Sequence, residues 1–172
     1  TEEAKVPAIL YNVPSRTGCS LAASTVAYLA KNAEYVTAIK EASGDISHVA
    51  DIMYACDGAI DLYSGNDDQI VPILSLGGKG VISVLSNVAP KETHDIVALF
   101  LEGKIKESRE LQLKALPLVH ALFSEVNPIP VKAALNLMGK EVGPLRLPLT
   151  EMEAAHQEVL AEEMKKFGIK LA

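Results

Sequence analysis

The sequence has little of what disulfide-bonded, metal-bound or membrane-spanning proteins need. Its only two cysteines, Cys19 and Cys56, form no CxxC pair, which argues against a disulfide framework and a zinc site and favours reduced thiols in a cytosolic protein. The four histidines are scattered without metal-ligand spacing. No apolar run reaches about twenty residues and no signal-peptide pattern is present, so nothing in the sequence points to export or to a membrane span.

Basic residues are also in the minority. Lys and Arg number 16 against 22 Asp and Glu, a net charge of -6, which argues against nucleic acid or an anionic membrane as the main partner. No GxGxxG pattern follows any predicted strand, so a dinucleotide-binding fold has no direct support. The glycine-rich stretch Gly77–Gly80 precedes a predicted strand instead of opening a helix, and it is therefore interpreted as a turn.

The first hundred residues alternate between short apolar runs and amphipathic stretches. The runs predict strands at 6–11, 35–39, 60–63 and 81–84. The amphipathic stretches predict helices at 21–32, 46–56, 69–76 and 91–102, with Ser20 as an N-cap of the first and Asp45 or Ser47 beginning the second. Such alternation is typical of a parallel sheet with right-handed crossovers, in an α/β fold.

After Gly103 the pattern is helical. A helix is predicted at 105–123, which Pro117 should bend or break, and a second helix opens near Asn127 and ends at Leu137. An extended segment follows, and Thr150 to Glu153 has the pattern of a capping box that begins a last helix, reaching about Phe167.

Lys40 ends the apolar run Val36–Lys40, in which strand alternation places it on the face of Val36 and Ala38. A charged lysine is costly to bury there, and a neutral amine is a nucleophile that condenses with carbonyl compounds to a Schiff base. From this stretch alone a lysine that extends its ammonium group into water is the commoner alternative.

The loops that follow the predicted strands bear most of the polar motifs. In parallel α/β folds the chemistry lies at the carboxyl ends of the strands. Those ends carry Tyr11-Asn12-Val13-Pro14 with Arg16-Thr17-Gly18, Lys40-Glu41-Ala42-Ser43-Gly44-Asp45, Ser64-Gly65-Asn66-Asp67, and Gly80-Val81-Ile82-Ser83-Val84 with Asn87. Further on stand Asn127-Pro128-Ile129-Pro130-Val131-Lys132 and Leu145-Arg146-Leu147-Pro148-Leu149.

This ordered set resembles the dihydrodipicolinate synthase (4-hydroxy-tetrahydrodipicolinate synthase) branch of the pyruvate-dependent class I aldolase and N-acetylneuraminate lyase superfamily, from about Val6 to Met164. The resemblance implies an α/β fold that is the second half of a TIM (β/α)8 barrel, strands five to eight, plus a C-terminal helical extension. The implied division is 1–103 for the half barrel and 104–172 for the extension. A complete barrel takes about 250 residues, so the first half lies outside this sequence.

The resemblance also implies the roles of four residues. Lys40 is the Schiff-base lysine, and Tyr11 relays protons near the imine, together with a threonine from the first half of the barrel and a tyrosine of a neighbouring subunit. Arg16 binds the carboxylate of aspartate semialdehyde, and Ile82 offers a backbone carbonyl to pyruvate. The alternatives from the residues alone are a core tyrosine for Tyr11 and an ordinary exposed loop arginine for Arg16.

The implied activity is that of a lyase in diaminopimelate and lysine biosynthesis, which condenses pyruvate with L-aspartate 4-semialdehyde without metal or organic cofactor. Asn66, Asp67 and Asp68 are expected to cap the following helix, not to bind a metal. The implied protein is a cytoplasmic homotetramer, or this chain pairs with the missing half and is inactive alone. The alternatives are another pyruvate aldolase, of the 2-keto-3-deoxy acid or N-acetylneuraminate lyase type, and a non-catalytic assembly module.

The same resemblance predicts an exposed apolar patch on the isolated half barrel. Its members are the strand residues that would face the barrel interior, Pro7, Ile9, Val36, Ala38 and Val81 or Ile82.

Overall fold

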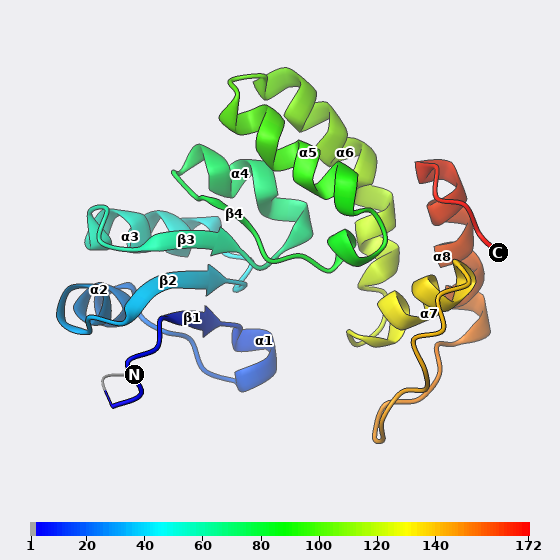
Figure 1. The fold of residues 1–172 in the computed structure, drawn as a ribbon, viewed down its shortest axis with the longest axis horizontal. Coiled ribbons are helices and arrows are strands. Elements are labelled where there is room, and N and C mark those ends of the chain that lie inside the picture. Colours follow the sequence, from blue (N-terminus) through cyan, green and yellow to red (C-terminus); the bar gives the residue numbers. More distant parts are fainter. Residues whose placement is uncertain (1–2) are drawn as a thin grey trace. The chain divides into compact units, whose positions relative to one another are not determined.

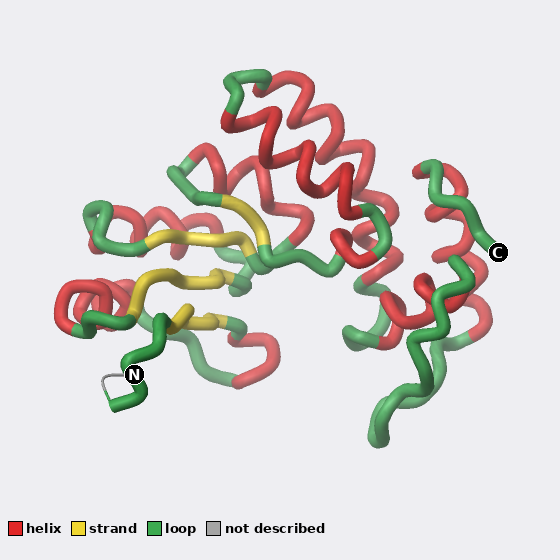
Figure 2. The backbone as a smooth tube through the Cα atoms, in the orientation of Figure 1, coloured by secondary structure: helices red, strands yellow, loops and turns green. Residues whose placement is uncertain are grey.

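The computed structural model describes residues 3–172, which divide after Ile82 into two compact units (Figure 1). The first unit is an α/β layer and the second consists of helices and connecting loops (Figure 2). No helix in the described residues is both long enough and apolar enough to cross a membrane.

The first unit contains one sheet of four parallel strands. They lie side by side in chain order, β1-β2-β3-β4, with the bounds β1 Ala8–Asn12, β2 Val36–Glu41, β3 Asp61–Ser64 and β4 Gly80–Val81. The predicted alternation and the parallel sheet are confirmed. The fourth strand is shorter than predicted, because it ends at Val81.

The core of this unit lies on one face of the sheet. Leu10, Ile39 and Leu62 stand at the same level of three neighbouring strands, and the last two are fully buried. Their partners come from the helices that follow the strands, α2 Ala23–Asn32, α3 Ile46–Cys56 and α4 Ile70–Ser75. Because strand side chains alternate, the residues next to Ile39 and Leu62 in sequence point to the opposite face.

Two helix starts in this unit were predicted from capping residues. Asp45 begins α3 as expected, since its carboxylate accepts hydrogen bonds from the backbone N–H groups of Ser47 and His48. The prediction for α2 was wrong: the helix is capped by Ala22, two residues after Ser20. The Ser20 hydroxyl lies instead beside Asn12 at the end of β1, so a contact far along the chain replaces the local cap.

The second unit is built from helices around its own core. Its elements are the 3₁₀ helix η2 Leu85–Asn87 and α5 Pro90–Leu101, α6 Ile105–Leu122, α7 Ile129–Leu137 and α8 Ala154–Phe167. The predicted break of the long helix at Pro117 was wrong, because α6 is continuous through it, and the alternative of a bend stays a prediction. Leu118, Val119 and Leu122 are buried in the core just after the proline, and this packing supports the turn that lacks a backbone donor.

The predicted capping box at the start of α8 was also wrong. The N-cap is Glu153 and its side chain makes no capping bond. The Glu125 carboxylate supplies the acceptor instead: it bonds to the backbone N–H of Glu153 at 3.0 Å and to Nδ1 of His156 at 2.8 Å. The hydrogen bond from His156, and next that from Glu153, hold the pKa of Glu125 below its ordinary value.

The expected boundary after Gly103, between the half barrel and the C-terminal extension, stays a prediction. In the structure α5 packs against α6 and η2, so it belongs to the compact helical unit that begins at Ser83.

Candidate active site

One level of the sheet gathers three side chains that carry an amine or a phenol near the carboxyl ends of the strands. The register pairs Tyr11 of β1 with Lys40 of β2, Lys40 with Tyr63 of β3, and Tyr63 with Gly80 of β4. Residues paired in register point to the same face, and this face is the one opposite Ile39 and Leu62. Tyr11, Lys40 and Tyr63 therefore form a row on the face that the helices of this unit leave uncovered.

Lys40 is half-buried in this row, one residue before the end of its strand. Its Nζ atom lies 4.3 Å from the centroid of the Tyr11 ring, within the range of a cation–π contact. Val36 and Ala38 on the same strand are buried, whereas Tyr11 is 52% exposed. The amine is thus held beside a phenol and close to an apolar surface while remaining accessible, which a nucleophile and its proton donor require.

Gly65 leaves the space that the Lys40 side chain occupies. A Cβ atom at position 65 would lie 2.5 Å from Cβ of Ala42 and 3.1 Å from Cε of Lys40. Its backbone N–H is bonded to the carbonyl oxygen of Glu41 at 2.7 Å, so the backbone has little freedom to withdraw. The glycine after β3 is therefore required by the close approach of Ala42, and the Lys40 stem lies next to it.

Arg16 lies on the short helix α1 Pro14–Thr17, which follows β1 directly. The helix ends at Gly18, whose φ of 68° is in the left-handed region. The Arg16 side chain is exposed, and its guanidinium forms no ion pair with any carboxylate among residues 3–172. The structure thus presents Arg16 after β1 with its charge uncompensated, but it does not bring it into contact with Lys40.

Ile82 was expected inside the last strand and lies directly after it. Its backbone N–H still continues the ladder, donating to the carbonyl oxygen of Ser64 at 2.8 Å, and its side chain is 39% exposed. The expected capping by Asn66 is not formed: Asn66 precedes the 3₁₀ helix η1 Asp67–Gln69 without a side-chain capping bond, and Asp67 and Asp68 lie in that turn.

Two features of this edge had no assigned role at the level of sequence. Tyr63 flanks Lys40 in register, and the signal was its place as the last residue of the predicted strand 60–63, just as Tyr11 ends the predicted strand 6–11. Asn12 and Glu41 form a buried pair at the strand ends, and the signal was an amide and a carboxylate that directly follow Tyr11 and Lys40. The two residues lie 29 positions apart in the chain, so no local pattern reveals their contact.

The fold and this edge define a class: α/β proteins with a lysine beside a tyrosine near the carboxyl ends of parallel strands. Within that class, residues 1–167 match the model of the dihydrodipicolinate synthetase family. The chain belongs to this family.

Relatives and solved structures agree with the assignment. The chain is 62% identical over 164 residues to a 4-hydroxy-tetrahydrodipicolinate synthase of Lachnoclostridium phytofermentans, covering 95% of this chain and 56% of that relative. It superposes with a TM-score of 0.94 on dihydrodipicolinate synthase of Thermotoga maritima, at 42% identity over 97% of this chain and 58% of the other. With the chloride-inhibited enzyme of Acinetobacter baumannii, solved in complex with pyruvate, the TM-score is 0.94 at 37% identity, covering 98% and 58%. The chain therefore spans somewhat more than half the length of these proteins.

Proposed function

We propose that this chain is the catalytic second half of a 4-hydroxy-tetrahydrodipicolinate synthase. In this proposal β1 to β4 are strands five to eight of a TIM (β/α)8 barrel, and residues 104–172 form the C-terminal helical extension. Four parallel strands in chain order support the barrel, as does the coverage of 56–58% of full-length relatives. The observation that carries the proposal is the Lys40 amine beside the Tyr11 ring at the carboxyl edge of the sheet.

Each residue has a role in the proposed condensation. The Lys40 amine attacks the ketone carbon of pyruvate, and loss of water gives an imine. Loss of a proton from the methyl group converts the imine to an enamine, whose carbon attacks the aldehyde of L-aspartate 4-semialdehyde. Tyr11 transfers protons at the imine nitrogen and the forming hydroxyl, since a phenol both donates and accepts. The product amine then displaces Lys40 as the ring closes.

Two more residues bind the substrates. The Arg16 guanidinium binds the carboxylate of the semialdehyde through paired charge-assisted hydrogen bonds. The backbone carbonyl of Ile82 contacts bound pyruvate. The chain needs no metal or organic cofactor for these steps, because the protonated imine formed on Lys40 is the electron sink. The proposed setting is a cytoplasmic homo-oligomer, a tetramer as in the family, or an assembly with a separate first half.

The experiment uses a chimera that places the first part of the Lachnoclostridium relative, up to its matched region, before this chain. The chimera should consume pyruvate only when L-aspartate 4-semialdehyde is supplied. Turnover with a sugar-derived aldehyde, and none with the semialdehyde, would instead indicate another pyruvate aldolase. Absence of any turnover together with a folded, assembled chimera would indicate a non-catalytic module.

Arg16→Ala in the chimera should weaken use of the semialdehyde far more than imine formation with pyruvate. Loss of a charge-assisted hydrogen-bonded pair costs about 1.5–3 kcal/mol, which lowers kcat/KM for the semialdehyde roughly ten- to a hundredfold. Steady-state kinetics with each substrate varied in turn measures the difference, and Arg146→Ala on the second unit is the matched control. Equal damage to both steps would mean that Arg16 is structural.

Gly65→Ala should slow imine formation at Lys40, because the new Cβ would lie 2.5 Å from Cβ of Ala42, which must shift, and 3.1 Å from Cε of Lys40, two residues before it. A displacement of this kind is expected to lower the rate by at least about tenfold. Stopped-flow measurement of imine formation gives the rate. Gly80→Ala is the control, since its Cβ would make only ordinary contacts, 3.6 Å from the Tyr63 ring. Equal rates in the two variants would contradict the steric role of Gly65.

A further inference from the structure

Next to the row of Tyr11, Lys40 and Tyr63 lies a second row that points to the other face of the sheet. It consists of Asn12 and Glu41, paired in register and each 1% exposed. Buried polar groups at the end of an apolar core are costly unless each finds a partner. The hydrogen-bond partners of Asn12 and Glu41 therefore indicate which segments of the chain these two side chains fix in position.

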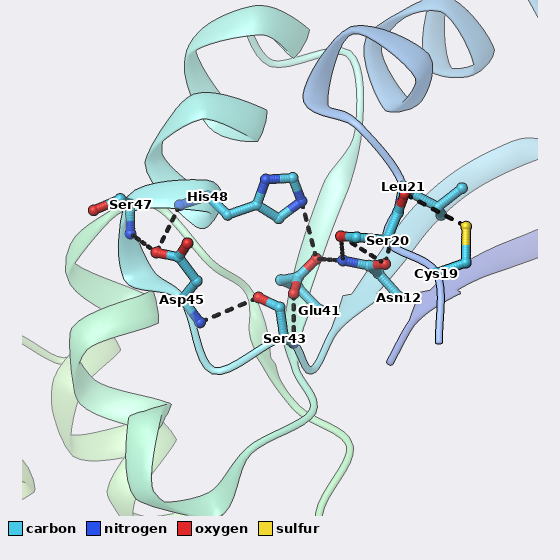
Figure 3. A network of polar contacts seen from close by, with 9 residues as sticks. All are labelled: Asn12, Cys19, Ser20, Leu21, Glu41, Ser43, Asp45, Ser47 and His48. Atoms are coloured by element: carbon cyan, nitrogen blue, oxygen red, sulfur yellow. Dashed lines mark hydrogen bonds and ion pairs between the residues drawn. The ribbon is translucent and has the colours of Figure 1, made fainter. Parts of the chain in front are cut away.

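The Asn12 amide is bonded on both sides. Its Nδ2 donates to Oε2 of Glu41 at 2.8 Å, and its Oδ1 accepts the backbone N–H of Leu21 at 2.9 Å. The Ser20 hydroxyl lies 3.3 Å from the same Nδ2 (Figure 3). Leu21 and Ser20 are the point at which the chain returns from the loop that carries Arg16. Asn12 thus joins the two ends of that loop, residues 13–21.

The Glu41 carboxylate uses both oxygens. Oε2 accepts from Asn12, and Oε1 accepts the backbone N–H of Ser43 at 2.6 Å, in the turn that leads to α3 (Figure 3). Nε2 of His48, on α3, lies 3.9 Å from Oε2. Glu41 directly follows Lys40 on β2. The hydrogen bond from Asn12 to Glu41 therefore links the end of β1 to the strand that carries the proposed nucleophile.

We propose that Asn12 and Glu41 are positioning residues, which fix the Arg16 loop relative to the strand that carries Lys40. The inference rests on the proposed function only in that Arg16 binds the second substrate. Neither residue touches a reacting atom, because both point to the helix-covered face. Their effect is to determine where the Arg16 guanidinium stands when the semialdehyde carboxylate arrives at the imine.

The donor and acceptor pattern allows a stringent test in the chimera. Asn12→Asp places two carboxylates against each other, and Glu41→Gln leaves one of two donors without its acceptor. The double variant Asn12→Asp, Glu41→Gln reverses the roles: the new amide donates to the new carboxylate, which still accepts from Leu21. The new amide oxygen still accepts from Ser43. All three hydrogen bonds are thereby restored.

Each single variant should raise KM for the semialdehyde at least about tenfold while KM for pyruvate changes less than about twofold, and the double variant should recover most of the loss. Asn32→Ala is the matched control, since it removes an exposed amide that bonds to the Tyr28 carbonyl away from this edge. No rescue in the double variant, or an equal rise of both KM values, would overturn the proposal.

Hydrogen exchange on the unmodified chimera tests the same claim without any variant. The amide of Leu21 lies outside α2, and among residues 3–172 its acceptor is Oδ1 of Asn12, so it should exchange about as slowly as the sheet amides. Exchange as fast as that of the exposed loop would overturn the proposal even if the single variants do not fold. Failure of the proposed function would be seen separately, as the absence of a pyruvate adduct on Lys40 while Leu21 stays protected.

Discussion

Lys40→Met in the chimera is expected to abolish condensation of pyruvate with aspartate semialdehyde, with a loss of roughly a thousandfold or more in kcat. Methionine keeps the length and apolar contacts of the lysine stem against Tyr11 and Gly65, so the sheet should remain intact. It removes the amine to which the proposal assigns the imine. Turnover measured alongside thermal unfolding separates loss of chemistry from loss of fold.

Lys79→Met is the control for this variant. Lys79 is exposed and stands just before β4 in the same unit, so its loss should leave turnover within about twofold. Lys40→Met with more than about a tenth of the original activity would show that another amine, or no covalent intermediate, carries the reaction.

The second large effect concerns the chain by itself. The described sheet has unpaired edges at β1 and β4, and edge strands of this kind pair readily with other chains. Val6 and Ile9 near the first edge are 57% and 52% exposed, which adds apolar surface there. We expect the isolated chain to self-associate and to show no turnover, because the proposed proton relay lacks the threonine of the first half.

Adding the first half of the barrel as a separate chain should restore both solubility and activity. Sedimentation velocity and the condensation assay, run before and after mixing, measure the two effects. A compact monomer with cooperative unfolding, or turnover by the chain without a partner, would contradict this account of the half barrel. The predicted exposed patch is smaller than expected, since Val36 and Ala38 are buried in the structure.

Local patterns predicted the fold where neighbouring residues determine it. The strand and helix order followed from apolar periodicity, and α3 begins and ends where Asp45 and the apolar stripe indicated. The errors fall where a distant group intervenes. The Ser20 hydroxyl contacts Asn12 instead of capping α2. At the start of α8, the carboxylate of Glu125 accepts the backbone N–H of Glu153, 28 residues away, in place of the predicted capping box.

The candidate site divides in the same way. Motifs at the strand ends pointed to Lys40 and Tyr11, and the register places these two side by side. The steric need for Gly65 and the buried Asn12–Glu41 pair depend on distances between strands, which the sequence does not contain. Predicting them requires the register of the sheet, since only the register decides which residues of separate strands stand level.

The measurement that tests the central claim most directly is reduction of the pyruvate-loaded chimera with sodium borohydride, followed by peptide mapping. The account predicts a single reduced pyruvate adduct, on Lys40, which disappears in Lys40→Met and persists in Lys79→Met. An adduct on Lys79 or Lys132, or none on a chimera that turns over, would contradict it.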